Sequence, residues 1–284
     1  MCHWKTFKGQ DVQPFTQFVL SMITAGTIYT LVNFFVSIPC SLDYCSYLSN
    51  DTLLMILSLP NTLSFIAYLL ANFGFCIYRF CIIFGLMKLH HKAIQLATLY
   101  IPWILAIYAV CDTTYRGCIK RFNRWSIGYT YNCSNCSVWF GFNFVDVNFY
   151  AGQVLPILMC TMYIVMIIDI YLKRRGKGFV VSSSVSDAKL TFQYFLVCSV
   201  QYLASFLFYI VPKFGNGHVL AVAGMNIIGV VDVGVNPLIL LIFNAKVRES
   251  LITLFSFLPC CESNRKATIS ILTTYPVNSI KALA

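Results

Sequence analysis

The sequence predicts an all-α membrane protein: a bundle of six membrane-spanning helices followed by a short amphipathic helix. Composition is the first observation behind this prediction. Of the 284 residues, 58% are hydrophobic, 16% are aromatic and only 11% are charged, unlike a soluble domain. The second observation is spacing, because charged residues leave uncharged stretches long enough to cross a bilayer, which takes about 20 helical residues.

The expected spans are the apolar stretches between neighbouring groups of charged residues. They cover residues 14–38, 53–79, 93–111, 147–169, 190–212 and 219–243. Residues 125–145 are also uncharged, but this segment is too polar for hydrocarbon, so we expect an aromatic loop at the membrane surface. The amphipathic helix follows at 245–258. One transmembrane domain thus covers residues 1–262, and we expect the polar tail 263–284 to be disordered.

The distribution of basic residues predicts a multi-pass protein with both ends of the chain in the cytoplasm. Short cytoplasmic loops carry an excess of lysine and arginine, and this orientation places most of the 20 such residues inside. The N-glycosylation sequons at Asn50, Asn132 and Asn135 then all lie outside. The net charge of +10 therefore reflects topology, and we expect no nucleic-acid partner.

The 13 cysteines divide according to this topology. An even number of outward-facing cysteines in an oxidising space predicts disulfides, whose pairing the sequence leaves open. We expect a bridge between the loop of Cys40 and Cys45 and the long outer loop. Either reversible palmitoylation or two unmodified thiols fits Cys260 and Cys261, which follow the amphipathic helix. The disulfide candidates are Cys40, Cys45, Cys111, Cys118, Cys133 and Cys136.

Polar side chains within the spans are candidates for function, because each needs a partner where there is no water. Most of them are expected to join helices by hydrogen bonds. Asp232 differs as the only acid well inside a span, one helical turn before Asn236-Pro237, where proline weakens the helix. Two interpretations stay open. The acid serves a conformational switch, or it is hydrogen-bonded to Asn72 or Asn226 for packing alone.

Arg79 ends the second span, and two interpretations apply to it as well. The guanidinium group can extend to the lipid headgroups as an ordinary anchor. Alternatively, it is a fixed positive charge against which a moving helix or a partner protein docks.

Several features occur together in the order of a known family. They are Tyr78-Arg79-Phe80 at the inner end of a span, Cys133 in a long outer loop, residues 187–193 leading to Gln201, and Asn236-Pro237 followed by residues 243–248. In this order the chain resembles the nematode serpentine chemoreceptors, most nearly class x. These are seven-helix G-protein-coupled receptors with a rhodopsin-like bundle. The resemblance runs from about Lys5 to Cys261.

The resemblance implies a chemosensory receptor in the plasma membrane, for instance of a sensory neuron. Its partners would be an unknown external small molecule, a heterotrimeric G protein, the lipid bilayer and a further receptor copy, with no cofactor or metal. The expected ligand pocket comprises Asp146, Asn148, Gln201, Tyr209 and Asn226. The expected switch and G-protein face comprises Arg79, Asp232, Asn236, Pro237, Lys246 and Arg248.

The chain departs from the family pattern in three ways. It has six spans rather than seven, and the first is the one missing, because residues 6–9 resemble the inner loop that would follow it. Tyr78 replaces the acid or asparagine before the arginine, and Leu240 replaces a tyrosine after the proline. A truncated, non-signalling product therefore remains an alternative. So does a transporter or channel subunit, although a second broken helix is missing. Enzymatic motifs are absent, so no catalysis is expected.

Overall fold

The computed structural model describes residues 14–41, 50–86, 91–123, 128–132, 136–138, 141–176, 182–214 and 219–243. The chain divides into two compact units, Met1–Pro237 and Leu238–Ala284. All contacts described below lie within the first unit. The described part of the second unit is the end of the last helix.

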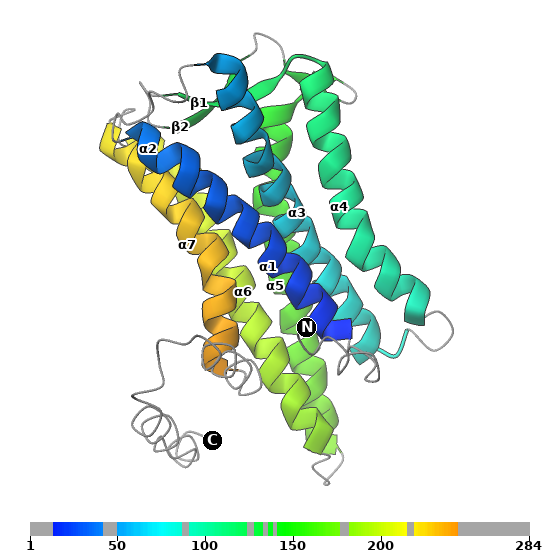
Figure 1. Ribbon diagram of the computed structural model, residues 1–284. Coiled ribbons are helices and arrows are strands. Elements are labelled where there is room, and N and C mark those ends of the chain that lie inside the picture. Colours follow the sequence, from blue (N-terminus) through cyan, green and yellow to red (C-terminus); the bar gives the residue numbers. More distant parts are fainter. Residues whose placement is uncertain are drawn as a thin grey trace, which may run out of the picture. The chain divides into compact units, whose positions relative to one another are not determined.

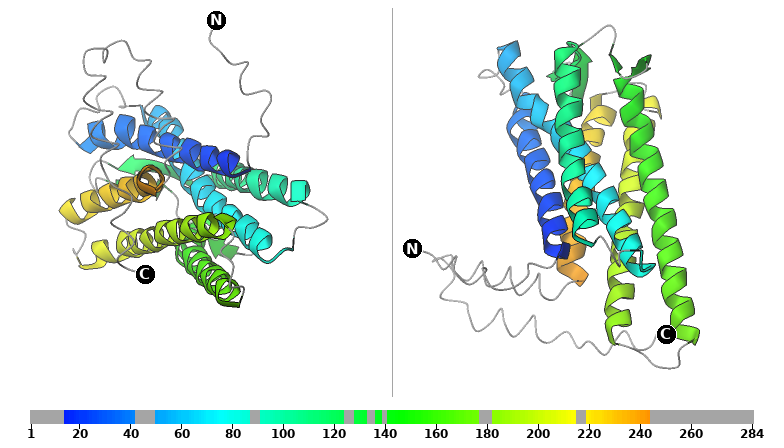
Figure 2. Two further views of the ribbon diagram at one scale, coloured as in Figure 1. Left: turned by 90° about the horizontal axis from the view of Figure 1, so that it is seen from below. Right: turned by 90° about the vertical axis from the view of Figure 1, so that its right-hand side faces the viewer.

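Long helices make up most of the described chain (Figure 1). The first runs from α1 (Pro14–Val32) through the π-helical turn η2 (Asn33–Ser37) into α2 (Ile38–Ser41). The others are α3 (Asp51–Ile83), α4 (His91–Tyr115), α5 (Phe144–Gly176), α6 (Ser182–Phe214) and α7 (Val219–Phe243). In the first unit α3 packs against α1, α4 and α5, while α5 and α6 lie side by side (Figure 2).

The prediction of an all-α membrane bundle is confirmed. Among the described residues, five helical segments are long and apolar enough to cross a membrane: Gln17–Cys40, Thr52–Ile83, Lys92–Tyr115, Phe144–Lys173 and Ala188–Phe208. The 25-residue helix α7 has the bounds expected for the sixth span. The expected amphipathic helix 245–258 and the tail 263–284 lie outside the described residues.

The exposed faces of the helices are apolar, as expected for contact with lipid. On α4, Tyr100, Ile104 and Tyr108 follow one another at one-turn intervals and are 56%, 62% and 51% exposed. Polar side chains such as Asn61 and Asn72 are instead buried between helices. Because hydrocarbon offers hydrogen bonds to neither backbone nor side chain, this inverted pattern suits a bilayer and not water.

Small residues allow the helices to approach closely. A Cβ atom on Gly74 of α3 would lie 2.5 Å from the carbonyl oxygen of Thr98 on α4. A Cβ atom on Gly26 of α1 would lie 2.7 Å from Val233 Cγ1 on α7. Gly74 therefore allows two backbones to approach closely, and Gly26 makes room for the Val233 side chain.

A two-stranded hairpin caps one end of the first unit, which we call the hairpin end. Strands β1 (Ile119–Asn123) and β2 (Gly128–Asn132) pair antiparallel, and the short strands β3 (Ser137–Val138) and β4 (Phe142–Asn143) pair next to α5. The sequence predicted an aromatic loop here without strands. The buried Phe122 of β1, which packs with Val36, Cys40 and Leu54, explains the difference because it gives the hairpin a small core.

Disulfide bonds constrain the hairpin end. Cys118 is bonded to Cys136, so the bridge lies within the long outer loop. Cys40 is disulfide-bonded too, and its partner lies outside the described residues. Cys111, which was expected among the disulfide candidates, carries a free and exposed thiol. The reason is its position inside α4, on the same outward face as Tyr108, rather than in the loop.

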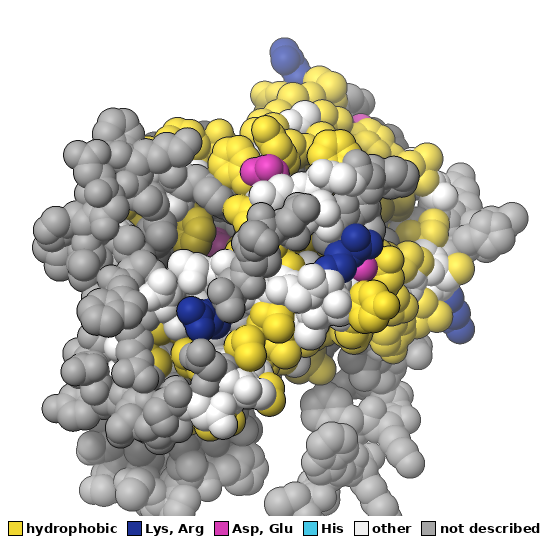
Figure 3. Space-filling model, turned by 90° about the horizontal axis from the view of Figure 1, so that it is seen from above, with side chains coloured by type: hydrophobic (Ala, Val, Ile, Leu, Met, Phe, Trp, Pro, Cys, Tyr) yellow, Lys and Arg dark blue, Asp and Glu magenta, His cyan; other side chains and the backbone are white. Residues whose placement is uncertain are grey.

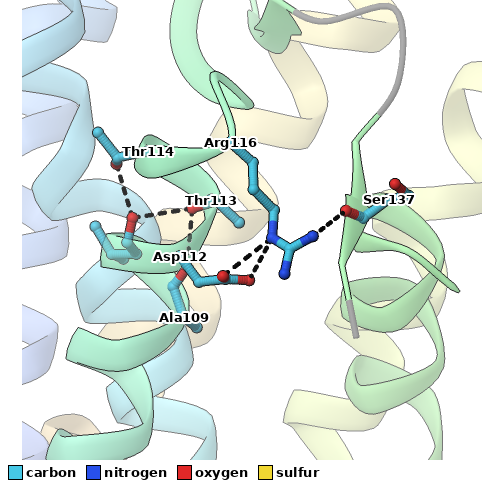
Figure 4. A network of polar contacts seen from close by, with 7 residues as sticks. Ala109, Asp112, Thr113, Thr114, Arg116 and Ser137 are labelled. Carbon is cyan, nitrogen blue, oxygen red and sulfur yellow. Dashed lines mark hydrogen bonds and ion pairs between the residues drawn. The ribbon is translucent and has the colours of Figure 1, made fainter. Parts of the chain in front are cut away.

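Arg116 makes a second, non-covalent link at this end of the first unit (Figure 4). Its Nε donates to both carboxylate oxygens of Asp112, at 3.0 and 3.1 Å, and its Nη1 donates to the carbonyl oxygen of Ser137 at 3.3 Å. The guanidinium group thus joins the end of α4 to β3. As this ion pair is partly exposed, its contribution is at most about 1 kcal/mol.

Aromatic side chains fill the bundle at the opposite end, which we call the far end. The centroids of Phe18 and Phe75 are 5.2 Å apart, those of Phe75 and Tyr194 are 4.5 Å apart, and Tyr163 and Tyr194 are stacked at 6.5 Å. Tyr78 joins this group through Phe18 at 5.0 Å. These five buried rings, the aromatic cluster, come from α1, α3, α5 and α6.

Candidate ligand cavity

A cavity of about 360 Å³ lies in the first unit, where the hairpin meets α3, α5, α6 and α7. Phe65, Leu69 and Phe208 contribute to its apolar lining. Its size falls in the range of about 300–1,000 Å³ that is typical of small-molecule sites. Seen from above, the hairpin end carries hydrophobic side chains with scattered basic and acidic ones among them (Figure 3).

Four polar atoms in the cavity wall have no hydrogen-bond partner among the described residues. They are Asp232 Oδ1 from α7, Gln201 Oε1 from α6, and Thr62 Oγ1 and Asn61 Nδ2 from α3. These residues are 9%, 3%, 4% and 1% exposed, so bulk water reaches them little. A buried polar atom without a partner costs about 1–3 kcal/mol, and native proteins keep few of them. These four atoms can bind a polar molecule in the cavity.

Lys120 of β1 brings a positive charge to the same cavity. Its Nζ donates to Asn61 Oδ1 at 2.7 Å and lies 5.0 Å from the centroid of the Tyr129 ring. Both partners are uncharged, and no acidic side chain among the described residues forms an ion pair with Lys120. Burial lowers the pKa of Lys120 to about 8, because it disfavours the charged ammonium group.

The π-helical turn η2 of the first helix contacts the hairpin through hydrogen bonds. The buried Ser37 hydroxyl donates to Asn33 Oδ1 at 2.9 Å and is hydrogen-bonded to the Tyr129 hydroxyl at 3.0 Å. Burial raises the pKa of Tyr129 to about 12, so its hydroxyl keeps its proton at neutral pH. The hairpin, the first helix and the Lys120 ammonium group are therefore held by one set of contacts.

Arg79 lies at the far end, next to the aromatic cluster. Only 8% of the residue is exposed, and Nη2 donates to Thr191 Oγ1 of α6 at 3.3 Å. A buried guanidinium group that contacts a neighbouring helix does not match an anchor extended to the headgroups. The other interpretation, a fixed charge against which a moving helix or a partner protein docks, stays a prediction.

Residues 142–265, which include α5, α6 and α7, match the family described as serpentine type 7TM GPCR chemoreceptor Srt. Over this stretch, which is less than half of the chain, the protein is similar to the serpentine chemoreceptors. The matched class is Srt, and not class x, which the motifs in the sequence resembled most nearly. A comparison with curated proteins found no match.

Three of the five expected pocket residues line the receptor's cavity: Asn148, Gln201 and Asn226. Asp146 does not, because it lies in the exposed first turn of α5. Two residues of helix turn the side chain by roughly 200°, so Asp146 and Asn148 point in opposite directions. The side chain of Tyr209 lies outside the described part of the receptor.

The expected switch residues are not gathered in one place. Asp232 lines the cavity, and Asn72 Nδ2 donates to the carbonyl oxygen of Tyr68 at 3.1 Å. Asn226 lines the same cavity as Asp232, whose Oδ1 has no partner among the described residues. The side chains of Asn236 and Pro237 are not described, and Lys246 and Arg248 lie outside the described residues, as do Cys45, Cys133, Asn135, Cys260 and Cys261. Asn50 is exposed, and its side chain caps α3 by accepting from Thr52 N at 2.9 Å.

Sequence reasoning missed Lys120 and Tyr129 as cavity residues. Lys120 was counted only as a basic residue of the outer loop. Alternation along β1 would have revealed it, because Lys120 and the buried Phe122 share one face of the strand while Arg121 faces the other way. That signal requires knowing that the segment forms a strand.

Proposed function

We propose that this receptor binds an external small molecule in the cavity and signals to a heterotrimeric G protein on the opposite side of the membrane. The observation that carries the proposal is the set of unpartnered polar atoms on Asp232, Gln201 and Thr62. They belong to three different helices and face one cavity. A molecule that binds them holds those helices in one arrangement.

Two observations support an external position for the hairpin end in the plasma membrane. Disulfides persist in oxidising compartments, and the Cys118–Cys136 bridge lies at this end. The distribution of lysine and arginine places the same loop outside, with both termini in the cytoplasm. The cavity is then reached from the exterior, and Arg79 lies near the cytoplasm.

Helix α6 connects the cavity to the far end. Gln201 lines the cavity and Thr191 binds Arg79, and their separation of ten positions corresponds to roughly 15 Å of helix. A ligand that prefers one position of α6 therefore also changes the contact with Arg79. Such coupling between two sites amounts to about 1–3 kcal/mol in typical receptors and enzymes.

The Arg79–Thr191 contact gives a test that does not require the natural ligand. Thr191→Val removes the hydroxyl that accepts from Arg79 at almost constant volume. We expect faster basal GTP exchange on co-expressed G proteins, because α6 is released from α3. Nucleotide exchange is measured in membranes with equal receptor levels at the cell surface.

Thr161→Val is the matched control, because the Thr161 hydroxyl is exposed and bonds only the carbonyl oxygen of Ile157 in its own helix. It should leave basal exchange unchanged. If neither the unmodified receptor nor Thr191→Val changes nucleotide exchange on any heterotrimer tested, the proposed signalling function is contradicted.

A further inference from the structure

The cavity wall is chemically asymmetric. Lys120 and Asn61 place a cationic group at the hairpin, while Asp232 and Gln201 present hydrogen-bond acceptors from α6 and α7. Apolar side chains, such as those of Leu69 and Val233, also line the cavity. An occupant that matches all three parts needs two different polar groups separated by a hydrocarbon body.

The Lys120 ammonium group specifies the first polar group. It is partly buried, and its described partners, Asn61 Oδ1 and the Tyr129 ring, are both neutral. A buried cation without an anion is costly, and charge-assisted hydrogen bonds are about twice as strong as neutral ones. An anionic group on the occupant would offset that cost, whereas a hydroxyl group would do so much less.

The acceptors specify the second polar group. Asp232 Oδ1 and Gln201 Oε1 can accept hydrogen bonds, and both are buried without a donor among the described residues. A second carboxylate on the occupant would be repelled there. A hydroxyl or amino group, in contrast, would satisfy these atoms.

From this arrangement we infer that the receptor's ligand class is a small amphipathic organic acid with a hydrogen-bond donor at its other end. Its carboxylate pairs with Lys120, its donor reaches Asp232 and Gln201, and its hydrocarbon part lies against the apolar wall. The inference rests on the proposed function, since it names the ligand class of the same cavity.

The experiment measures binding to the purified full chain in lipid nanodiscs, without a G protein. The probes are straight-chain ω-hydroxycarboxylates of increasing length, each compared with the diol of equal length. Inorganic phosphate and chloride serve as anions that lack a hydrocarbon body. Ligand-dependent thermal stabilisation gives the dissociation constants.

We expect at least one hydroxy acid to bind about tenfold or more tightly than its diol, because only the acid pairs with Lys120. Lys120→Gln should abolish that preference. Arg121→Gln should retain it, because Arg121 is the next residue of the same strand and does not line the cavity. Asp232→Asn should weaken binding of the hydroxy acid more than that of the matching acid without a hydroxyl.

Asn61→Asp is a second variant that tests the role of the Lys120 charge even if Lys120→Gln does not fold. The new carboxylate would lie where Asn61 Oδ1 now accepts from Lys120 at 2.7 Å, and would neutralise the ammonium group in place. The preference for the acid over the diol should then disappear.

The inference is overturned if no hydroxy acid binds better than its diol, if the preference survives Asn61→Asp, or if phosphate or chloride alone stabilises the receptor equally well. The readout contains no G protein. Failure of the ligand class is therefore distinguishable from failure of signalling, which the Thr191→Val experiment measures.

Discussion

The two ends of the helix bundle differ in how their interiors are filled. At the far end the five rings of the aromatic cluster contact one another, and Arg79 is hydrogen-bonded to α6. At the hairpin end the same helices leave a cavity with unpartnered polar atoms. Close packing favours one arrangement of helices, whereas an open polar cavity leaves room for an occupant to select an arrangement. Under the proposed function, ligand binding and signal transmission therefore belong to different halves of the same helices.

The largest expected effect is a loss of stability when a ring is removed from the aromatic cluster. Phe75 is fully buried in the aromatic cluster, so Phe75→Ala should lower the free energy of unfolding by about 3–5 kcal/mol. Phe65 lies on the same helix but lines the cavity, where less packing is lost. Phe65→Ala should therefore cost less than half as much. Denaturant unfolding of both variants in detergent measures the difference, and equal losses would contradict the contrast between the two ends.

The second effect concerns the loop that closes the hairpin end. Cys118→Ser together with Cys136→Ser removes the bridge across 18 residues of sequence and should cost about 2–4 kcal/mol. Cys111→Ser is the control, since that thiol is free and exposed, and its thermal unfolding should match the unmodified receptor. If removing the bridge changed neither thermal unfolding nor ligand binding, the hairpin would not depend on it.

The third and smallest effect is a pH dependence confined to the hairpin end. Folding lowers the pKa of Lys120 from its usual 10.5 to about 8, so between these values the unfolded chain binds more protons than the folded one. The ligand-free receptor should therefore gain stability from Lys120 as the pH rises through that window. The affinity for a hydroxy acid should fall about tenfold per pH unit above about 8, because the pairing ammonium group is lost.

Titration of binding against pH checks this prediction, with the diol of equal length as the control. The other titratable groups that line the cavity are Tyr29 of α1, Tyr129 and Tyr131 of β2, and Asp232 of α7. Tyr129 stays neutral throughout, as its pKa is raised to about 12. An acid affinity that remained constant from pH 7 to 10 would exclude Lys120 as the pairing group.

The helices could be predicted from the sequence because uncharged runs of bilayer length leave few alternatives. Polar residues inside those runs, such as Gln201 and Asp232, could be identified for the same reason. Which of them meet at one cavity could not, since this depends on helix rotation. Asp146 and Asn148, two residues apart, fall on opposite sides of α5.

The hairpin was the least predictable part of the cavity. Its strands are short, and their support comes from residues distant in sequence, such as Val36 beneath Phe122 and Ser37 beneath Tyr129. Local propensity does not contain those contacts. From the sequence, Lys120 was therefore used only to orient the chain in the membrane, although it supplies the positive charge in the cavity wall.

The central claim is that occupancy of the cavity and the state of the far end are coupled. Its most direct test is the affinity of the best-binding hydroxy acid with and without a nucleotide-free heterotrimeric G protein. Because coupling is reciprocal, the G protein should tighten acid binding by about 5–150-fold. Thr191→Val should reduce the ratio of the two affinities for the acid, because it raises the affinity measured without G protein. Equal affinities in both conditions, with G-protein binding to the receptor verified, would contradict the claim.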